Sequence, residues 1–347
     1  MASESEVTWE LDGVTMRATL EVPEGPGPFP GVVMVAGSGP TDRDWCSPLL
    51  PGTNGSGRLL AAALAEAGYA SLRYDKRASG PDAAENARRL AGTFSMRSHL
   101  DELRAAVRVL VGDPRVDATR LVGLGNSEGT LHVLHYATGD EAVPLAGAVL
   151  CAPPGRSVGE VLLAQLALQA ASVPGGDAMM ARVREAAARY AAGEAMDPDP
   201  SLPESVRAVL ASFEAPANLP LGRELWVEGA APLLAEVSVP TLVLIGRKDV
   251  QVDAVADGGA LERAAAGKEF VTFAYPANAN HVLKEDPRPW AEVAAAPGSG
   301  YNEDGTRLDP ESVATILEWL RGVVDGASTA PSSPGAGDVP SGPRPPR

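Results

Sequence analysis

Predominantly apolar runs and amphipathic stretches alternate along the first half of the chain. Apolar runs typical of strands buried on both faces of a sheet occur at 31–36, 70–74, 120–124 and 145–151. Apolar residues at helical spacing occur between them, at 57–68, 96–111 and 127–138. This order predicts an α/β protein with a doubly wound, mostly parallel sheet.

The N-terminal residues follow a different pattern, in which apolar and polar side chains alternate. Residues 7–11 and 14–22 alternate in this way around Asp12 and Gly13, a pair that favours a tight turn. We therefore expect an antiparallel hairpin at one edge of the sheet.

The alternation stops between residues 153 and 232. That segment contains Ala-rich helical stretches interrupted by Pro and Gly, whereas strand patterns return at 240–245 and 269–273, followed by a helix at 310–324. We predict that a helical cap is inserted into one α/β core. The chain then divides into an N-terminal core part (1–152), the cap (153–232), a C-terminal core part (233–325) and a tail (326–347). The tail is rich in Pro, Ser and Gly and is expected to be disordered.

The composition is that of a folded protein, with 45% apolar and 21% charged residues. A net charge of −16 argues against a nucleic-acid partner, because phosphates attract clustered Lys and Arg. The sequence has neither a secretory leader nor an apolar stretch long enough to cross a membrane, which favours a cytoplasmic protein without a membrane partner. Cys46 and Cys151 are expected to be small buried side chains, and the sequence implies no metal and no organic cofactor.

The most informative motif is Gly-Asn-Ser-Glu-Gly at 125–129, a match to GxSxG between a predicted strand and a predicted helix. In that context the serine occupies a sharp turn, and the two glycines allow neighbouring segments to approach closely. We therefore predict Ser127 as a nucleophile.

The order of the remaining residues restricts its partners. When the nucleophile lies in a GxSxG turn between a strand and a helix, the acid and then the histidine of the catalytic triad follow the serine along the chain. His281 is the one histidine beyond the last strands, since His99, His132 and His135 fall on the helices around Ser127. We predict His281 as the general base.

The acid should follow the strand at 240–245. Asp249 lies four residues past that strand and is predicted to orient His281. Asp253 and Asp257 are alternatives, although they are expected to form an exposed first turn of the next helix, where a negative charge suits the helix dipole.

A serine attack on a carbonyl creates an oxyanion that needs two backbone N–H donors. We expect one donor to be the N–H of Glu128. The second should come from the glycine-rich loop after the strand at 31–36, where we assign Ser38, with Gly37 as the alternative.

Three segments resemble bacterial carboxylesterase-like members of the α/β-hydrolase superfamily: 37–44 matches GSGPxDRD, 74–80 is similar to YDKRGxG, and 125–129 is similar to GHSEG. The chain departs from these patterns at Ala36, where a His is usual, at Asn126, again in place of His, and at Ala78, in place of Gly. The resemblance covers about residues 7–324 and implies the α/β-hydrolase fold and ester hydrolysis.

Two further expectations concern the surroundings of the site. Charged residues of the first two segments should form an ion-pair and hydrogen-bond network that braces the oxyanion loop: Asp42, Arg43, Asp44, Asp75, Lys76 and Arg77. The apolar stretch 161–168 of the cap should pack against its own neighbours rather than line an acyl pocket.

These observations favour a serine hydrolase that cleaves a carboxylic ester of a small molecule through an acyl-enzyme. Thioester hydrolysis, or acyl transfer including lactonisation, uses the same three residues and is the alternative. A catalytically silent relative that binds a ligand is a third possibility, and a peptidase a fourth. The sequence does not specify the oligomeric state.

Overall fold

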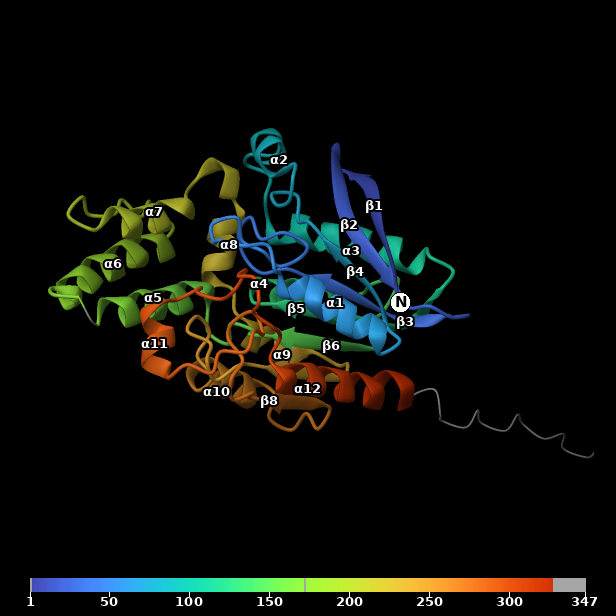
Figure 1. Cartoon of the computed structure of the whole chain (residues 1–347). Coiled ribbons are helices and arrows are strands. Elements are labelled where there is room, and N and C mark those ends of the chain that lie inside the picture. The colour runs from blue at the N-terminus through green and yellow to red at the C-terminus, as the bar shows by residue number, and fades with distance from the viewer. Residues whose placement is uncertain (1, 172, 327–347) are drawn as a thin grey trace, which may run out of the picture.

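The computed structural model describes residues 2–171 and 173–326 (Figure 1). Within this part of the chain, eight strands form one sheet. Their spatial order is β1 (Ser3–Leu11), β2 (Val14–Val22), β4 (Ala70–Tyr74), β3 (Phe29–Val35), β5 (Val116–Asn126), β6 (Gly147–Cys151), β7 (Thr241–Leu244) and β8 (Val271–Ala274). The strands from β4 to β8 run parallel, which confirms the predicted α/β class.

The N-terminal hairpin is also confirmed. β1 pairs with β2 in antiparallel register, and β2 in turn pairs antiparallel with β4. Asp12 and Gly13 form the turn with φ of 52° and 76°, the left-handed region that such a turn requires.

Helices cover both faces of the sheet because successive residues of the parallel strands point to opposite sides. In β3, Val33 and Val35 pack against α3 (Met96–Val111) and α4 (Glu128–Thr138), whereas Val32 and Met34 pack on the other face. That second face is covered by α1 (Ser56–Glu66) and α12 (Pro310–Leu320) (Figure 1). The sheet is therefore buried on both sides, as its apolar strands predict.

Several boundaries differ from the predicted ones. β5 begins at Val116 rather than 120, because residues 116–119 alternate in polarity and hide the start of the strand. Two short helices were not predicted, α2 (Ala83–Arg89) and α11 (Trp290–Ala295), each of which has a single buried residue. The predicted helix at 310–324 is divided into α12 and a π-helical end, η2 (Arg321–Asp325). The predicted disordered tail, beyond Gly326, lies outside the described residues.

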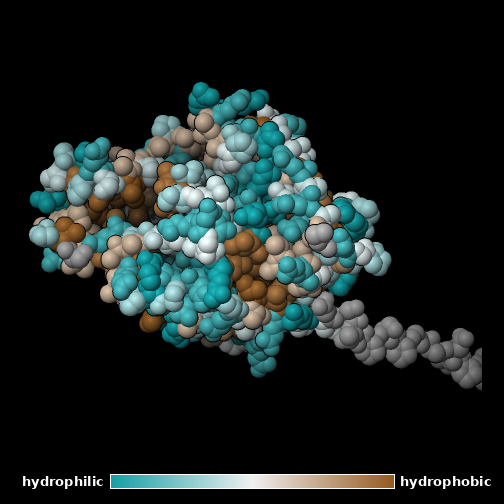
Figure 2. Space-filling model, in the orientation of Figure 1, coloured by the Kyte–Doolittle hydropathy of each residue, from teal (hydrophilic) through white to brown (hydrophobic). Residues whose placement is uncertain are grey.

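The segment between β6 and β7 is helical. It contains α5 (Val158–Ala170), α6 (Gly176–Ala191), α7 (Glu204–Ser212), η1 (Pro216–Asn218), α8 (Leu221–Val227) and α9 (Ala230–Glu236). Helices α5 to α8 share an apolar core that is distinct from the sheet, with Met180, Val183, Leu210 and Trp226 among its members. Figure 2 shows a hollow with apolar residues in the region of α6 to α8, while hydrophilic residues cover much of the remaining face.

The last helix of this segment belongs with the sheet instead. In α9, Ala230 and Leu234 are buried in the core on the α4 side. The predicted cap boundary at 232 therefore falls inside a helix that packs on the α/β core, while the division into cap and core stays a prediction.

Candidate active site

Ser127 lies at the junction of β5 and α4, at the carboxyl edge of the parallel sheet. Its φ of 53° and ψ of −124° lie in a sparsely populated region of backbone space, and its N–H donates to the carbonyl of Cys151 at 2.8 Å. A Cβ added to Gly125 would lie 2.5 Å from the carbonyl oxygen of Gly129. The turn that exposes Ser127 thus depends on glycine at 125, as the sequence argument anticipated.

The histidine and the acid predicted from the sequence are hydrogen-bonded to each other. The Nδ1 of His281 lies 2.9 Å from Oδ2 of Asp249, and both side chains are buried. The other carboxylate oxygen of Asp249 accepts from the backbone N–H groups of Gln251 and Val252, at 2.8 and 3.0 Å. The carboxylate is thereby fixed in orientation on the loop that follows β7.

Both alternative acids have other partners. Asp253 is exposed and accepts from the N–H groups of Val255 and Ala256, at the start of α10 (Ala256–Ala264), as predicted. The expectation of exposure was wrong for Asp257, which is buried because it pairs with Arg156 at 2.8 Å and also accepts from the backbone N–H of Asp253.

The three remaining histidines also contact carboxylates. His99 lies 3.1 Å from Glu102, His132 lies 3.2 Å from Glu128, and His135 lies 3.0 Å from Glu228. His135 lies on α4, and Glu228 is the residue that ends α8.

A pocket of about 330 Å³ contains Ser127 and His281 in its wall. Gly37 and Ser38, the two candidates for the second oxyanion donor, line the same pocket. A Cβ placed on Gly37 would lie 3.3 Å from the Cβ of Ser127, so the loop packs directly against the nucleophile. The structure therefore brings Ser127, His281 and the loop at Gly37 to one pocket, and Asp249 is hydrogen-bonded to His281 outside its lining.

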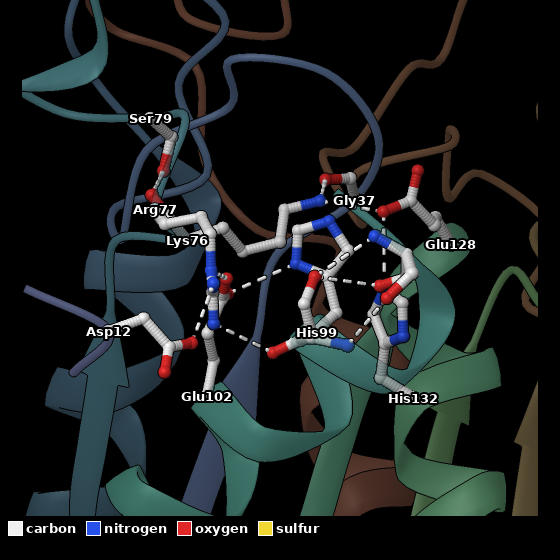
Figure 3. A network of polar contacts seen from close by, with 11 residues as sticks. Asp12, Gly37, Lys76, Arg77, Ser79, His99, Glu102, Glu128 and His132 are labelled. Carbon is white, nitrogen blue, oxygen red and sulfur yellow. Dashed lines mark hydrogen bonds and ion pairs between the residues drawn. The ribbon is translucent and has the colours of Figure 1, made fainter. Parts of the chain in front are cut away.

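The buried ammonium group of Lys76 links the loop after β3 to the start of α4, the two segments that carry the predicted oxyanion donors (Figure 3). Lys76 Nζ donates to the carbonyl of Gly37 at 2.7 Å and to Oε1 of Glu128 at 2.8 Å. Burial alone would raise the pKa of Glu128, but the charge of Lys76 and the hydrogen bond with His132 hold that pKa well below its usual value. Glu128 is therefore a carboxylate, and its side chain points towards Lys76 (Figure 3).

The network continues away from the pocket through two more histidines and a second ion pair (Figure 3). The rings of His99 and His132 lie 5.0 Å apart, and burial lowers the pKa of His132 to about 4. Glu102 pairs with Arg77, which also reaches Asp12 at 3.0 Å. The spacings of three and four residues between His99 and Glu102 and between Glu128 and His132 could have indicated these contacts from the sequence.

The other charged residues of the first two segments make contacts within the loop and with the neighbouring strand β4. Asp75 accepts from the backbone N–H of Arg43 at 2.8 Å, and burial raises the pKa of Asp75 to about 6. Asp44 binds Arg73 at 2.8 Å, a partner that sequence reasoning missed. Asp42 accepts from the N–H groups of Asp44 and Cys46, both at 2.9 Å, and so closes the turn.

Comparison with protein families agrees with this architecture. A family model described as "Alpha/beta hydrolase family" matches residues 32–296, which include Ser127, Asp249 and His281. The chain belongs to the α/β hydrolase family. The matched range begins in β3 and extends through the helical segment to the end of α11.

A curated relative is an esterase. Esterase EstD of Thermotoga maritima is 32% identical over 148 residues, which cover 42% of this chain. The same alignment covers 32% of the esterase, so the chain spans about a third of that relative's length.

Solved α/β hydrolases resemble the chain over most of its length. Proline iminopeptidase of Mycobacterium smegmatis has a TM-score of 0.54 at 18% identity, with 93% of this chain and 100% of that chain covered. Esterase Pf2001 of Pyrococcus furiosus has a TM-score of 0.52 at 16% identity, with 93% of each covered. Dienelactone hydrolase of Anabaena variabilis has a TM-score of 0.51 at 16% identity, with 93% and 99% covered. At these identities the likeness shows the fold alone.

The two cysteines are buried and unpaired, as predicted, and burial raises the pKa of the Cys46 thiol to about 11 and that of Cys151 to about 12. Within residues 2–171 and 173–326, no three His, Cys, Asp or Glu side chains are grouped as metal ligands. No helix in the described ranges combines the length and the apolar character that a membrane span requires.

Proposed function

We propose that this α/β hydrolase is a serine hydrolase that cleaves the carboxylic ester of a small molecule through an acyl-enzyme. The observation that carries the proposal is the 2.9 Å hydrogen bond between Asp249 and Nδ1 of His281, because His281 lines the same pocket as Ser127. The partial match to an esterase supports an ester as the substrate.

The first half of the reaction follows from which nitrogen of His281 is engaged. Because Asp249 holds Nδ1–H, Nε2 takes the proton of Ser127 Oγ as that oxygen attacks the ester carbonyl carbon. The carbonyl electron pair moves to the oxygen, and it returns when the C–O bond to the alcohol breaks. His281 gives its proton to the departing alcohol oxygen, and Asp249 stabilises the imidazolium meanwhile.

The second half repeats these steps with water. His281 removes a proton from water, and the resulting hydroxide adds to the acyl carbon bound to Ser127. When that intermediate collapses, the bond to Ser127 Oγ breaks, the serine regains a proton from His281, and the carboxylic acid leaves.

The oxyanion formed in both halves is held by the N–H groups of Glu128 and Ser38 in this proposal. Glu128 is the first residue of α4, where the free N–H groups and the helix dipole favour negative charge. Ser38 follows Gly37, whose backbone packs against Ser127. Gly37 donating in place of Ser38 is the alternative.

The experiment is hydrolysis of p-nitrophenyl esters of increasing acyl length by wild type, Ser127→Ala and Asp249→Asn. We expect Ser127→Ala to lower kcat by about 10⁴ to 10⁶-fold and Asp249→Asn by about 10⁴-fold. Asp253→Asn is the matched control, because the exposed Asp253 carboxylate accepts from the backbone N–H groups of Val255 and Ala256 at the start of α10 and does not line the pocket. Retention of most activity in a folded Ser127→Ala protein contradicts the proposal.

A further inference from the structure

The pocket is uncharged although the protein carries a net charge of −16. Among the described residues that line it, none has a carboxylate, an ammonium or a guanidinium group. The sequence contains three glutamines, and all three line this pocket: Gln165, Gln169 and Gln251. The glutamine amides of the sequence therefore all lie at this one site.

Two of these glutamines come from the helical segment above the sheet. Gln165 and Gln169 are four residues apart on α5, so they lie on the same face of that helix. Leu166 and Ala170, one position further along, are buried in the core that α5 shares with α6 to α8. As predicted, the apolar side of α5 packs against neighbouring helices, and its amide side is turned to the pocket.

Hydrogen bonds connect this amide side to the reacting histidine. Gln165 Nε2 donates to the backbone carbonyl of Gln251 at 3.2 Å, and Gln251 Nε2 lies 3.1 Å from the hydroxyl of Tyr301. The Tyr301 ring stacks on His281 at 6.4 Å between centroids and an interplanar angle of 24°. The wall of amides thus extends from α5 to Tyr301, whose ring stacks on His281, the proposed general base.

Such a wall discriminates between substrates by their polarity. A carboxylate or phosphate would lose hydration without meeting a cation, which is costly. An aliphatic group would displace water from the amide surface of the wall without replacing the hydrogen bonds that the water made there. An uncharged amide or hydroxyl group satisfies both requirements.

We infer that this pocket selects uncharged esters that carry an amide or hydroxyl group, and that Gln165 and Gln169 are its specificity-determining residues. The inference rests on the proposed function, because it concerns the substrate of the same site. It separates neutral polar esters both from anionic thioesters, such as those with a nucleotide portion, and from simple fatty esters.

The test uses esters that differ in one group and match in size. The first set comprises the methyl esters of N-acetylglycine and 4-methylpentanoic acid and the monomethyl ester of succinic acid. The second set comprises acetates of N-acetylethanolamine, 4-methylpentanol and 4-hydroxybutanoate. Each kcat/KM is divided by the rate constant for hydroxide-catalysed hydrolysis of the same ester, which removes differences in intrinsic reactivity.

In at least one set we expect the amide ester to exceed its aliphatic counterpart by about tenfold. The anionic ester should fall below the amide ester by about a hundredfold. Gln165→Leu and Gln169→Leu, singly or together, should lower the amide-to-aliphatic ratio by about three- to tenfold. Leu168→Gln is the matched control, because Leu168 lies on the exposed side of α5 and should leave the ratio unchanged.

Equal or faster normalised hydrolysis of the aliphatic or anionic ester in both sets overturns the inference. An unchanged ratio in folded Gln165→Leu/Gln169→Leu protein also overturns it. Labelling of Ser127 by a fluorophosphonate in the same preparation distinguishes failure of the substrate inference from failure of the proposed function. A labelled enzyme with the wrong preference refutes only the choice of substrate, whereas an unlabelled and inactive enzyme refutes the proposed function as well.

Discussion

The side-chain amide of Asn126 donates a hydrogen bond to the backbone carbonyl of His281, with 2.9 Å between Nδ2 and the oxygen. Asn126 immediately precedes Ser127, and both Asn126 and His281 are buried. One bond therefore links the nucleophile turn to the loop that carries the proposed general base. The ring of His281 is fixed by Asp249 and its backbone by Asn126.

Asn126→Ala should lower kcat by about tenfold with little change in KM, because loss of the bond lets the His281 loop move relative to Ser127. Steady-state kinetics with a p-nitrophenyl ester measures both constants. Asn126→His is the informative companion, since an imidazole N–H at this position retains a donor and should preserve more of kcat. Equal kcat values in wild type and Asn126→Ala would show that the link has no role in positioning.

Lys76→Met should destabilise the protein by about 3 to 5 kcal/mol, because it leaves the carboxylate of Glu128 buried without its cation. The double variant Lys76→Met/Glu128→Gln should regain most of that free energy of unfolding, measured by urea denaturation. Its kcat should nevertheless stay below that of wild type, since the bond from Lys76 to the carbonyl of Gly37 is still lost. Full recovery of kcat in the double variant would mean that Lys76 serves stability alone.

Gly125→Ala should lower the free energy of unfolding by about 3 kcal/mol, because the added Cβ would lie 2.5 Å from a backbone oxygen that cannot move aside. Gly322→Ala provides the control. Gly322 lies in η2, and a Cβ there meets no atom within 4 Å, so this variant should change stability by less than about 1 kcal/mol. Thermal or urea unfolding of both proteins measures the contrast, and a well-folded, fully stable Gly125→Ala protein would contradict the steric account of the turn.

His132 should make the protein sensitive to mild acid. Burial lowers the pKa of His132 to about 4, whereas an unfolded histidine titrates near 6.5, so the unfolded chain binds the proton first as the pH falls. The free energy of unfolding should therefore decrease between pH 6.5 and 4, by at most about 1.4 kcal/mol per pH unit from this residue.

The comparison of wild type with His132→Gln isolates this contribution. Asp75, whose pKa is raised to about 6, acts in the opposite sense over part of the same range, because the folded state then holds the extra proton. Both proteins contain Asp75, so its effect cancels in the difference. Denaturant unfolding at a series of pH values should give a shallower pH dependence for His132→Gln, and parallel curves would refute the assignment.

The strands of the sheet could be predicted from the sequence because each strand is marked by a local pattern of residues. Apolar runs mark β3 and β4, and the Asp12–Gly13 pair marks the hairpin turn. α2 and α11 escaped prediction because each is short and buries one residue, which leaves no apolar periodicity to detect. Chain order brought Asp249 and His281 into consideration together, and the structure places them in hydrogen-bond contact.

Contacts between distant segments could not be obtained in this way. Lys76 and Glu128 are 52 residues apart, and their pairing depends on how β3, β4 and β5 are ordered in space. The role of Gln165 and Gln169 likewise depends on which side of α5 faces the sheet. Helical spacing places the two glutamines on one face of α5. Only the packing of α6 and α8 against the opposite face of α5 shows that the glutamine face is the one turned to the pocket.

The most direct test of the proposed mechanism is the intact mass of the protein after brief exposure to a fluorophosphonate. Wild type should gain the mass of one phosphonyl group, localised by peptide mapping to Ser127, and Ser127→Ala should gain none. His281→Gln should react far more slowly, because the serine then lacks its base. Absence of an adduct on folded wild-type protein, or an adduct on another residue that persists in Ser127→Ala, would contradict Ser127 as the nucleophile.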